Sequence, residues 1–189
     1  MNRQNVLFWQ SHRDFLKLLL SFKFGSKLLL LLNYLIWPFL FFICFLLVRQ
    51  SANFFWQILM ATIVGEFIER YSKSKLFWKR PLYLRKDKTP YGLVKKWYET
   101  GSFPSGHTTK AVYFFLLTLQ AGIMNPFLYL LLTIPLLFFR VLVGFHYPID
   151  VIGGIAIGSF IWLVTHQLVF PPLLVETIQT IFNFVFFIK

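Results

Sequence analysis

The sequence predicts an all-α protein, a polytopic bundle of membrane-spanning helices. Of its 189 residues, 57% are hydrophobic and only 14% are charged, and the mean hydropathy is +0.64. A soluble domain carries about 25% charged residues, so this chain has too few polar side chains to cover a surface in water. A bilayer crossing takes about 20 apolar residues, which leaves room for about five or six spans in one membrane domain, residues 1–189. The apolar segments are too long for barrel strands.

Five segments are expected to cross the membrane, at residues 28–48, 54–68, 106–124, 127–139 or beyond, and 149–169. Residues 1–26 mix aromatic and basic side chains, which predicts a helix lying in the membrane interface. Pro38 is expected to kink the first span, and Glu66 shortens the apolar part of the second. Residues 70–103 are rich in Lys, Arg, Pro and Gly and predict a basic loop outside the hydrocarbon, over one face of the bundle. Residues 171–189 form an amphipathic tail that is either an interfacial helix or a sixth span.

The formal charge of +12 points to an anionic partner: nucleic acid, lipid headgroups or a phosphorylated substrate. The high hydropathy favours the bilayer and a membrane lipid phosphate, and we expect no nucleic acid. The single cysteine, Cys44, excludes an intrachain disulfide and a cysteine-built zinc site. We expect no metal and no cofactor, and the sequence indicates no obligate protein partner.

Polar residues at the span ends fall into three clusters. These are Lys73 with Arg80-Pro81 after the second span, Pro104-Ser105-Gly106-His107 at the start of the third, and Arg140, His146 and Asp150 between the fourth and fifth. Because successive spans alternate in direction, all three clusters are expected on one face of the membrane.

The first chemical task these residues suit is holding a phosphoryl group. Lys73, Arg80 and Arg140 supply three cations, and a guanidinium fork matches the oxygens of a phosphate. Ser105 is a good helix N-cap, and Gly106 lets a ligand approach the free N–H groups of the helix that follows. Together these five residues predict a phosphate cradle.

The second task is phosphoryl transfer. A neutral His146 can attack phosphorus, and Asp150, about one turn further along, can fix its tautomer and stabilise the resulting cation. His107 can protonate the departing oxygen and later activate water. The set predicts a metal-free phosphotransfer site. Lys110, one turn beyond His107, either points outward or lines the site, and the sequence leaves this open.

Each cluster alone has an ordinary structural explanation. A basic loop beside a membrane commonly binds headgroups or sets topology, a Ser at a helix start is commonly a cap, and a His with an Asp one turn away can be a structural pair. The occurrence of all three in order on one face favours catalysis, because Arg and His at the membrane edge are costly.

The three clusters resemble the signature of the type 2 phosphatidic acid phosphatase superfamily, the lipid phosphatase relatives of the vanadium haloperoxidases. The resemblance implies that His146 is the nucleophile, Asp150 its partner and His107 the general acid. It implies phosphate ligands at five further positions, which are Lys73, Arg80, Ser105, Gly106 and Arg140. The chain departs from the pattern at Phe139, where the family usually has Ser, and this removes one expected hydroxyl contact.

Within that superfamily the run from Phe145 to Gly154 and the Pro-rich tail look most like bacterial undecaprenyl-diphosphatases, which would place the chain in a bacterial cytoplasmic membrane. Phosphatidylglycerophosphate, phosphatidate and lipid A phosphatases share the motifs and remain alternatives, with headgroup selection expected in the loop from Leu82 to Ser102. A lipid phosphotransferase and an inactive basic membrane scaffold are the other two alternatives.

The site is expected on the N-terminal side of the membrane, but two arguments disagree on which side that is. Five basic residues precede the first span: Arg3, Arg13, Lys17, Lys23 and Lys27. The positive-inside rule therefore predicts the cytoplasm. The resemblance to undecaprenyl-diphosphatases, which recycle the isoprenoid carrier of the cell wall, implies the outer face.

Overall fold

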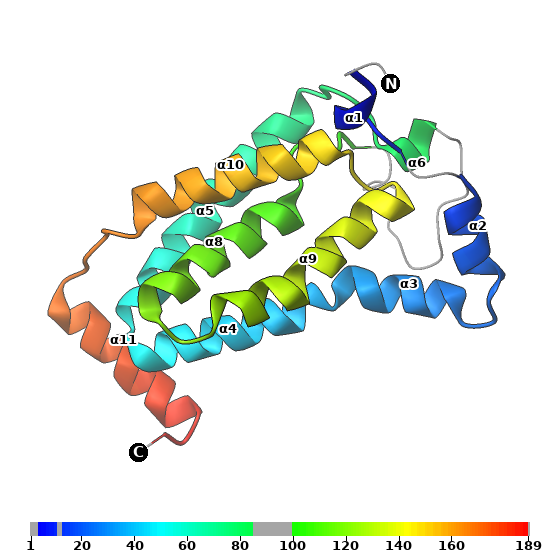
Figure 1. Cartoon of the computed structure of the whole chain (residues 1–189). Coiled ribbons are helices and arrows are strands. Elements are labelled where there is room, and N and C mark those ends of the chain that lie inside the picture. Colours follow the sequence, from blue (N-terminus) through cyan, green and yellow to red (C-terminus); the bar gives the residue numbers. More distant parts are fainter. Residues whose placement is uncertain (1–3, 11–12, 85–99, 189) are drawn as a thin grey trace.

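The computed structural model describes residues 4–10, 13–84 and 100–188, and the central part of the expected basic loop lies outside these ranges. The described residues form the following helices: α1 (Gln4–Leu7), α2 (Arg13–Ser21), α3 (Gly25–Tyr34), α4 (Ile36–Gln50), α5 (Asn53–Ser74), α6 (Pro81–Leu84), α8 (Gly106–Ala121), α9 (Pro126–Val143), α10 (Pro148–Thr165) and α11 (Pro172–Val185). The long helices run side by side, with α8 packed against α4, α9 and α10 (Figure 1). The predicted helical bundle is confirmed.

Three stretches of the described chain are long and apolar enough to cross a membrane on their own: α3 with α4, then α9, then α10. The protein is therefore an integral membrane protein. The two other expected spans correspond to α5, whose second half is charged, and α8, which has 16 residues. These two helices pack inside the bundle against α4 and α10.

The helix boundaries follow the local sequence. The first span is interrupted at Leu35, one turn before Pro38, where a proline ring clashes with the preceding turn. Asn125 caps α9 by accepting hydrogen bonds from the N–H groups of Phe127 and Leu128. Gly144, with a φ of 91°, ends α9 and turns the chain toward α10.

One expectation about helix extent was wrong, since the N-terminal segment forms two short helices, α1 and α2, instead of one. The helix that contains the expected second span, α5, continues beyond the apolar stretch 54–68 to Ser74. Ion pairs at i,i+4 spacing, Lys73 with Glu69 and Arg70 with Glu66, stabilise this extension.

Small residues allow α10 to approach α8 closely. A Cβ atom built on Gly158 would lie 2.5 Å from the carbonyl oxygen of Thr109, and one on Gly154 would lie 2.8 Å from that of Ser105. This contact fixes the start of α8 beside the start of α10. The backbone N–H of Ser105 also donates to the Asp150 carbonyl, at 3.0 Å.

Two apolar clusters hold the bundle together. The larger one joins α4, α8 and α10 through side chains such as Ile43, Leu117 and Ile161. The smaller one joins α6 to the end of α9 and contains Leu82 and Phe139. Phe139 is thus a packing residue that holds α6 against the end of α9. Arg80 immediately precedes α6 and is held in place with it.

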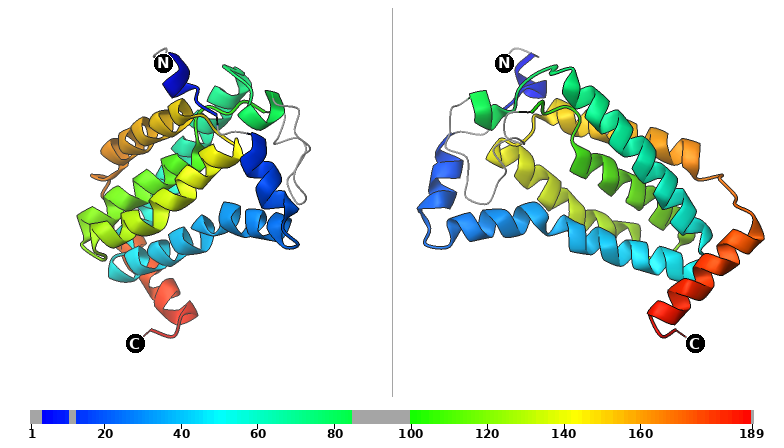
Figure 2. Two further views of the ribbon diagram at one scale, coloured as in Figure 1. Left: turned by 45° about the vertical axis from the view of Figure 1, so that its right-hand side comes forward. Right: turned by 180° about the vertical axis from the view of Figure 1, so that it is seen from behind.

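The C-terminal helix α11 is shorter than an ordinary bilayer crossing. Its 14 residues extend about 21 Å, which is less than the thickness of the hydrocarbon core. It lies at the end of the bundle opposite α1 (Figures 1 and 2) and contacts α4 through the rings of Phe182 and Phe186 on Phe45.

Candidate active site

One end of the bundle brings the three sequence clusters together. The end of α5, the starts of α8 and α10 and the end of α9 meet there, beside α1 (Figure 1). They surround a cavity of about 380 Å³ whose lining residues are Trp37, Glu66, Glu69, Lys73, Gly106, His107, Lys110, Arg140 and His146. Five of the eight predicted site residues line this cavity, and Arg80, Ser105 and Asp150 are buried next to it.

His146 lies in the connection between α9 and α10 and is 2% exposed. Its Nδ1 atom lies 3.4 Å from Oδ2 of Asp150, and this nitrogen makes no hydrogen bond. Asp150 is held in place by two donors, the Tyr147 backbone N–H at 2.8 Å on Oδ2 and the Trp78 indole N–H at 2.9 Å on Oδ1. The carboxylate is therefore fixed beside the imidazole.

The other ring nitrogen of His146 faces Arg140. The distance from Nε2 to the guanidinium Nη2 is 3.4 Å, and a guanidinium can only donate. This contact makes Nε2 the acceptor and places the ring proton on Nδ1, toward Asp150. Burial, with the cations of Arg80, Arg140 and Lys73, holds the pKa of His146 well below its usual value. The imidazole is neutral, with the lone pair on the side that faces Arg140.

Arg140 is oriented by a residue that the sequence analysis missed. Its Nη1 donates to Oδ1 of Asn33 on α3, 107 positions earlier in the chain. Asn33 is 5% exposed and lies inside an apolar segment. A polar residue there indicates in the sequence that a buried partner exists, but the identity of that partner depends on how α3 packs against α9.

Arg80 is fully buried. Its Nη1 donates to the carbonyl oxygen of Phe145 at 3.0 Å, which fixes the residue preceding His146. Burial lowers the pKa of Arg80 to about 10, while the Asp150 and Glu69 carboxylates oppose this shift. Arg80 is therefore a cation at neutral pH, close to the site.

Ser105 caps α8, as its position predicted. Its hydroxyl oxygen accepts from the N–H and the hydroxyl of Thr108, at 3.5 and 2.9 Å. Gly106 follows and lines the cavity, where a Cβ atom would collide with the Glu69 carboxylate. Gly106 therefore leaves room for the Glu69 carboxylate, which would have to move if this position carried a side chain.

His107 projects from the first turn of α8 into the same cavity. Its ring packs edge-on against Trp37, with 4.9 Å between centroids, and its buried Nε2 has no hydrogen-bond partner. An unpartnered ring nitrogen in a polar cavity is available to a ligand.

The structure resolves the position of Lys110, which lines the site cavity. Glu66 and Glu69 line it as well, and the sequence analysis did not assign them to the site. Their signal was the presence of carboxylates in a membrane helix, which are rare unless paired. Within the described residues, no group of three or more His, Cys, Asp or Glu side chains is placed to hold a metal ion.

One end of a membrane helical bundle thus brings together three cations and two histidines, a set of side chains whose chemistry suits a phosphate group. The model of the PAP2 superfamily matches residues 71–172, more than half of the chain and all eight predicted site residues, and the chain belongs to this superfamily. Its members are generally phosphatases, which supports a phosphatase-type activity. No curated protein and no solved structure matches the chain.

Proposed function

We propose that the protein is a metal-independent phosphohydrolase that acts on membrane lipid phosphates or diphosphates through a phosphohistidine intermediate. The observation that carries this proposal is the state of His146. It is buried and neutral, its Nδ1 proton faces Asp150, and its Nε2 lone pair faces Arg140, which can turn from it to a phosphate in the cavity that Lys73 and an unpartnered His107 also line.

In the first step, the Nε2 lone pair forms a bond to phosphorus and the bond from phosphorus to the lipid oxygen breaks. His107, which becomes protonated when the phosphate anion lies beside it, donates that proton to the departing oxygen. Lys73 and Arg140 compensate the charge on the phosphoryl oxygens, and Asp150 stabilises the imidazolium that His146 becomes.

In the second step, water attacks phosphorus and the bond to Nε2 breaks. His107, now neutral, accepts the proton of the attacking water, so that inorganic phosphate leaves and both histidines return to their starting states. Arg80 and Ser105 support this chemistry by fixing Phe145 and the start of α8 next to the phosphate.

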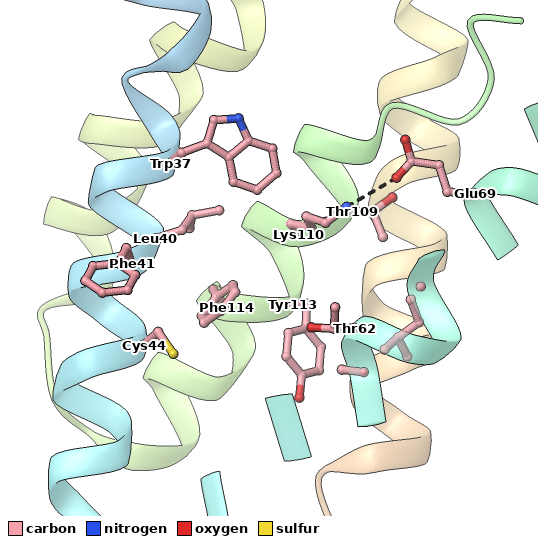
Figure 3. A pocket seen from close by; sticks show the side chains of 13 residues that line it. Trp37, Leu40, Phe41, Cys44, Thr62, Glu69, Thr109, Lys110, Tyr113 and Phe114 are labelled. Carbon is pink, nitrogen blue, oxygen red and sulfur yellow. Dashed lines mark hydrogen bonds and ion pairs between the residues drawn. The ribbon is translucent and has the colours of Figure 1, made fainter. Parts of the chain in front are cut away.

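An apolar pocket next to the site supports a lipid substrate. It has a volume of about 400 Å³ and shares Trp37, Glu69 and Lys110 with the site cavity (Figure 3). Its other walls are mostly apolar and include Leu40 and Phe114. A second apolar pocket, of about 470 Å³ between α8, α9 and α10, shares no residue with the site cavity. We therefore assign the first pocket to the hydrocarbon chain of the substrate.

For the particular lipid we propose undecaprenyl diphosphate, in a bacterial cytoplasmic membrane, on the resemblance of the Phe145 to Gly154 run. The test is a side-by-side assay of phosphate release from undecaprenyl diphosphate, phosphatidylglycerophosphate and phosphatidate, in detergent with a metal chelator. We expect the highest kcat/KM for undecaprenyl diphosphate. Preference for another lipid would replace this substrate, turnover only with an added acceptor would indicate a phosphotransferase, and no turnover of any lipid would indicate a scaffold.

A further inference from the structure

Four charged side chains form a continuous network along the wall of the site cavity. Lys110 Nζ on α8 lies 3.0 Å from Oε1 of Glu66 and 3.2 Å from Oε2 of Glu69 (Figure 3 shows the bond to Glu69). The other oxygen of Glu69 pairs with Nζ of Lys73. Both carboxylates come from α5, and all four residues line the cavity.

Glu69 occupies the part of this cavity where a phosphate ligand is expected. Its carboxylate is bound to Lys73 and lies directly against Gly106, at the start of α8. Its side chain is 19% exposed, compared with 43% for Glu66. Two residues of the proposed phosphate cradle are thus in contact with an anion that belongs to the protein.

A phosphate cannot use Lys73 fully while Glu69 holds it. The two anions would repel each other, and a half-buried carboxylate left without a partner would be unfavourable. Lys110 removes this difficulty, because it already contacts Glu69 and can keep that carboxylate after Lys73 changes partner. Glu66 has a second cation in Arg70, whose Nε lies 3.8 Å away.

We propose that substrate phosphate displaces Glu69 from Lys73 and that Lys110 retains the displaced carboxylate. When inorganic phosphate leaves, Glu69 returns to Lys73. No charge in the network then lacks a partner in either state, and Glu69 weakens the hold on the product. Lys110 is a positioning residue that acts through Glu69. This inference rests on the proposed role of Lys73 as a phosphate ligand.

The experiment is a double-mutant cycle on the dissociation constant of inorganic phosphate, measured by isothermal titration calorimetry on the full chain in detergent. Glu69→Gln should tighten phosphate binding about fivefold, because Lys73 loses its internal partner. Lys110→Met should weaken binding by a similar factor, because Glu69 then stays on Lys73. In the Glu69→Gln background, Lys110→Met should change the constant less than about twofold.

Two further variants serve as controls. Glu66→Gln removes the same charge from the same helix without freeing Lys73, and should change the constant less than about twofold. Lys110→Arg keeps a cation for Glu69 and should bind phosphate as tightly as the unmodified chain does. This variant also tests whether the chain still folds when residue 110 is replaced.

Several results would overturn the proposal. Equal weakening by Lys110→Met in both backgrounds would show that Lys110 binds phosphate directly. Equal tightening by Glu66→Gln and Glu69→Gln would show that the net charge of the site, and not the pairing of Glu69 with Lys73, controls phosphate binding. An absence of phosphate binding in every variant would show that phosphate does not replace Glu69 on Lys73. Because the readout is binding, the cycle can succeed in a chain that hydrolyses no lipid, in which case only the proposed phosphatase function fails.

Discussion

Replacing Asp150 by Asn tests how the site prepares His146 for attack. Three nitrogen atoms lie next to the oxygens of the Asp150 carboxylate: the Trp78 indole N–H at 2.9 Å, the Tyr147 backbone N–H at 2.8 Å, and Nδ1 of His146 at 3.4 Å. The first two are donors, and Arg140 makes the third a donor as well. A carboxylate accepts on both oxygens, whereas an amide accepts on one and donates from the other.

The Asn variant must therefore leave at least one of these donors without an acceptor. A hydrogen bond to a charged group contributes about 1.5–3 kcal/mol, so the free energy of unfolding should fall by about that amount. The larger effect should be on kcat, because the imidazolium formed in the first step loses its counter-charge. We expect kcat to fall about 10²-fold to 10³-fold, with KM changed much less.

The assay is phosphate release from a lipid phosphate in mixed micelles, with thermal unfolding of the same samples. Trp78→Phe is the matched control, since it removes one donor to Asp150 and leaves the carboxylate beside His146 unchanged. It should lower kcat less than about tenfold. If Asp150→Asn keeps more than a third of the unmodified kcat, or loses no more than Trp78→Phe does, the assigned role of the carboxylate is wrong.

Three further predictions concern the chain pocket, pH and helix packing. Ala61→Leu fills the apolar pocket next to the site and should lower kcat/KM at least about fivefold for a long-chain lipid phosphate, but not for a short-chain analogue. Ala111→Leu, in the other apolar pocket, is the control and should show no such effect of chain length. Because the pKa of His146 is lowered in the folded chain, only the unfolded chain gains this proton below about pH 6.5, so stability should decrease as pH falls, by at most about 1.4 kcal/mol per unit. His146→Gln should make denaturation curves between pH 8 and pH 5 correspondingly less pH-dependent. Gly158→Ala would place a methyl group 2.5 Å from the Thr109 carbonyl oxygen and should destabilise the chain by about 1–3 kcal/mol in thermal unfolding, and an unchanged melting temperature would show that α8 and α10 are not held at this distance.

The bundle and the convergence of the three clusters could be predicted because they depend on local features. Apolar segments of bilayer length, and turns such as Asn125-Pro126 between them, determine the order and direction of the helices. Alternating direction then places Lys73, His107 and His146 at one end. The side of the membrane that this end faces, and the substrate, stay predictions.

The details that could not be predicted depend on pairing between distant segments. The second span was expected to end at residue 68 because charged residues follow, but Glu66 and Glu69 find partners on α5 itself and in Lys110 on α8. A charged stretch whose side chains form ion pairs with one another can continue as a helix. Hydropathy alone does not show which charged side chains will pair. The contact between Asn33 and Arg140 likewise requires the packing of α3 on α9.

The central claim is that phosphoryl transfer passes through His146, and trapping the covalent intermediate tests it most directly. The protein is mixed with a lipid diphosphate labelled in its terminal phosphate, quenched in alkali, in which phosphohistidine survives, and digested for mass spectrometry. His107→Ala should slow the attack of water more than the first step, because the phosphate leaving group of a diphosphate needs little protonation, and should therefore increase the trapped fraction. We expect a phosphoryl group on His146 in the unmodified chain, more of it in His107→Ala, and none in His146→Ala. Undiminished hydrolysis by His146→Ala, or a label on any other residue during turnover, would contradict the mechanism.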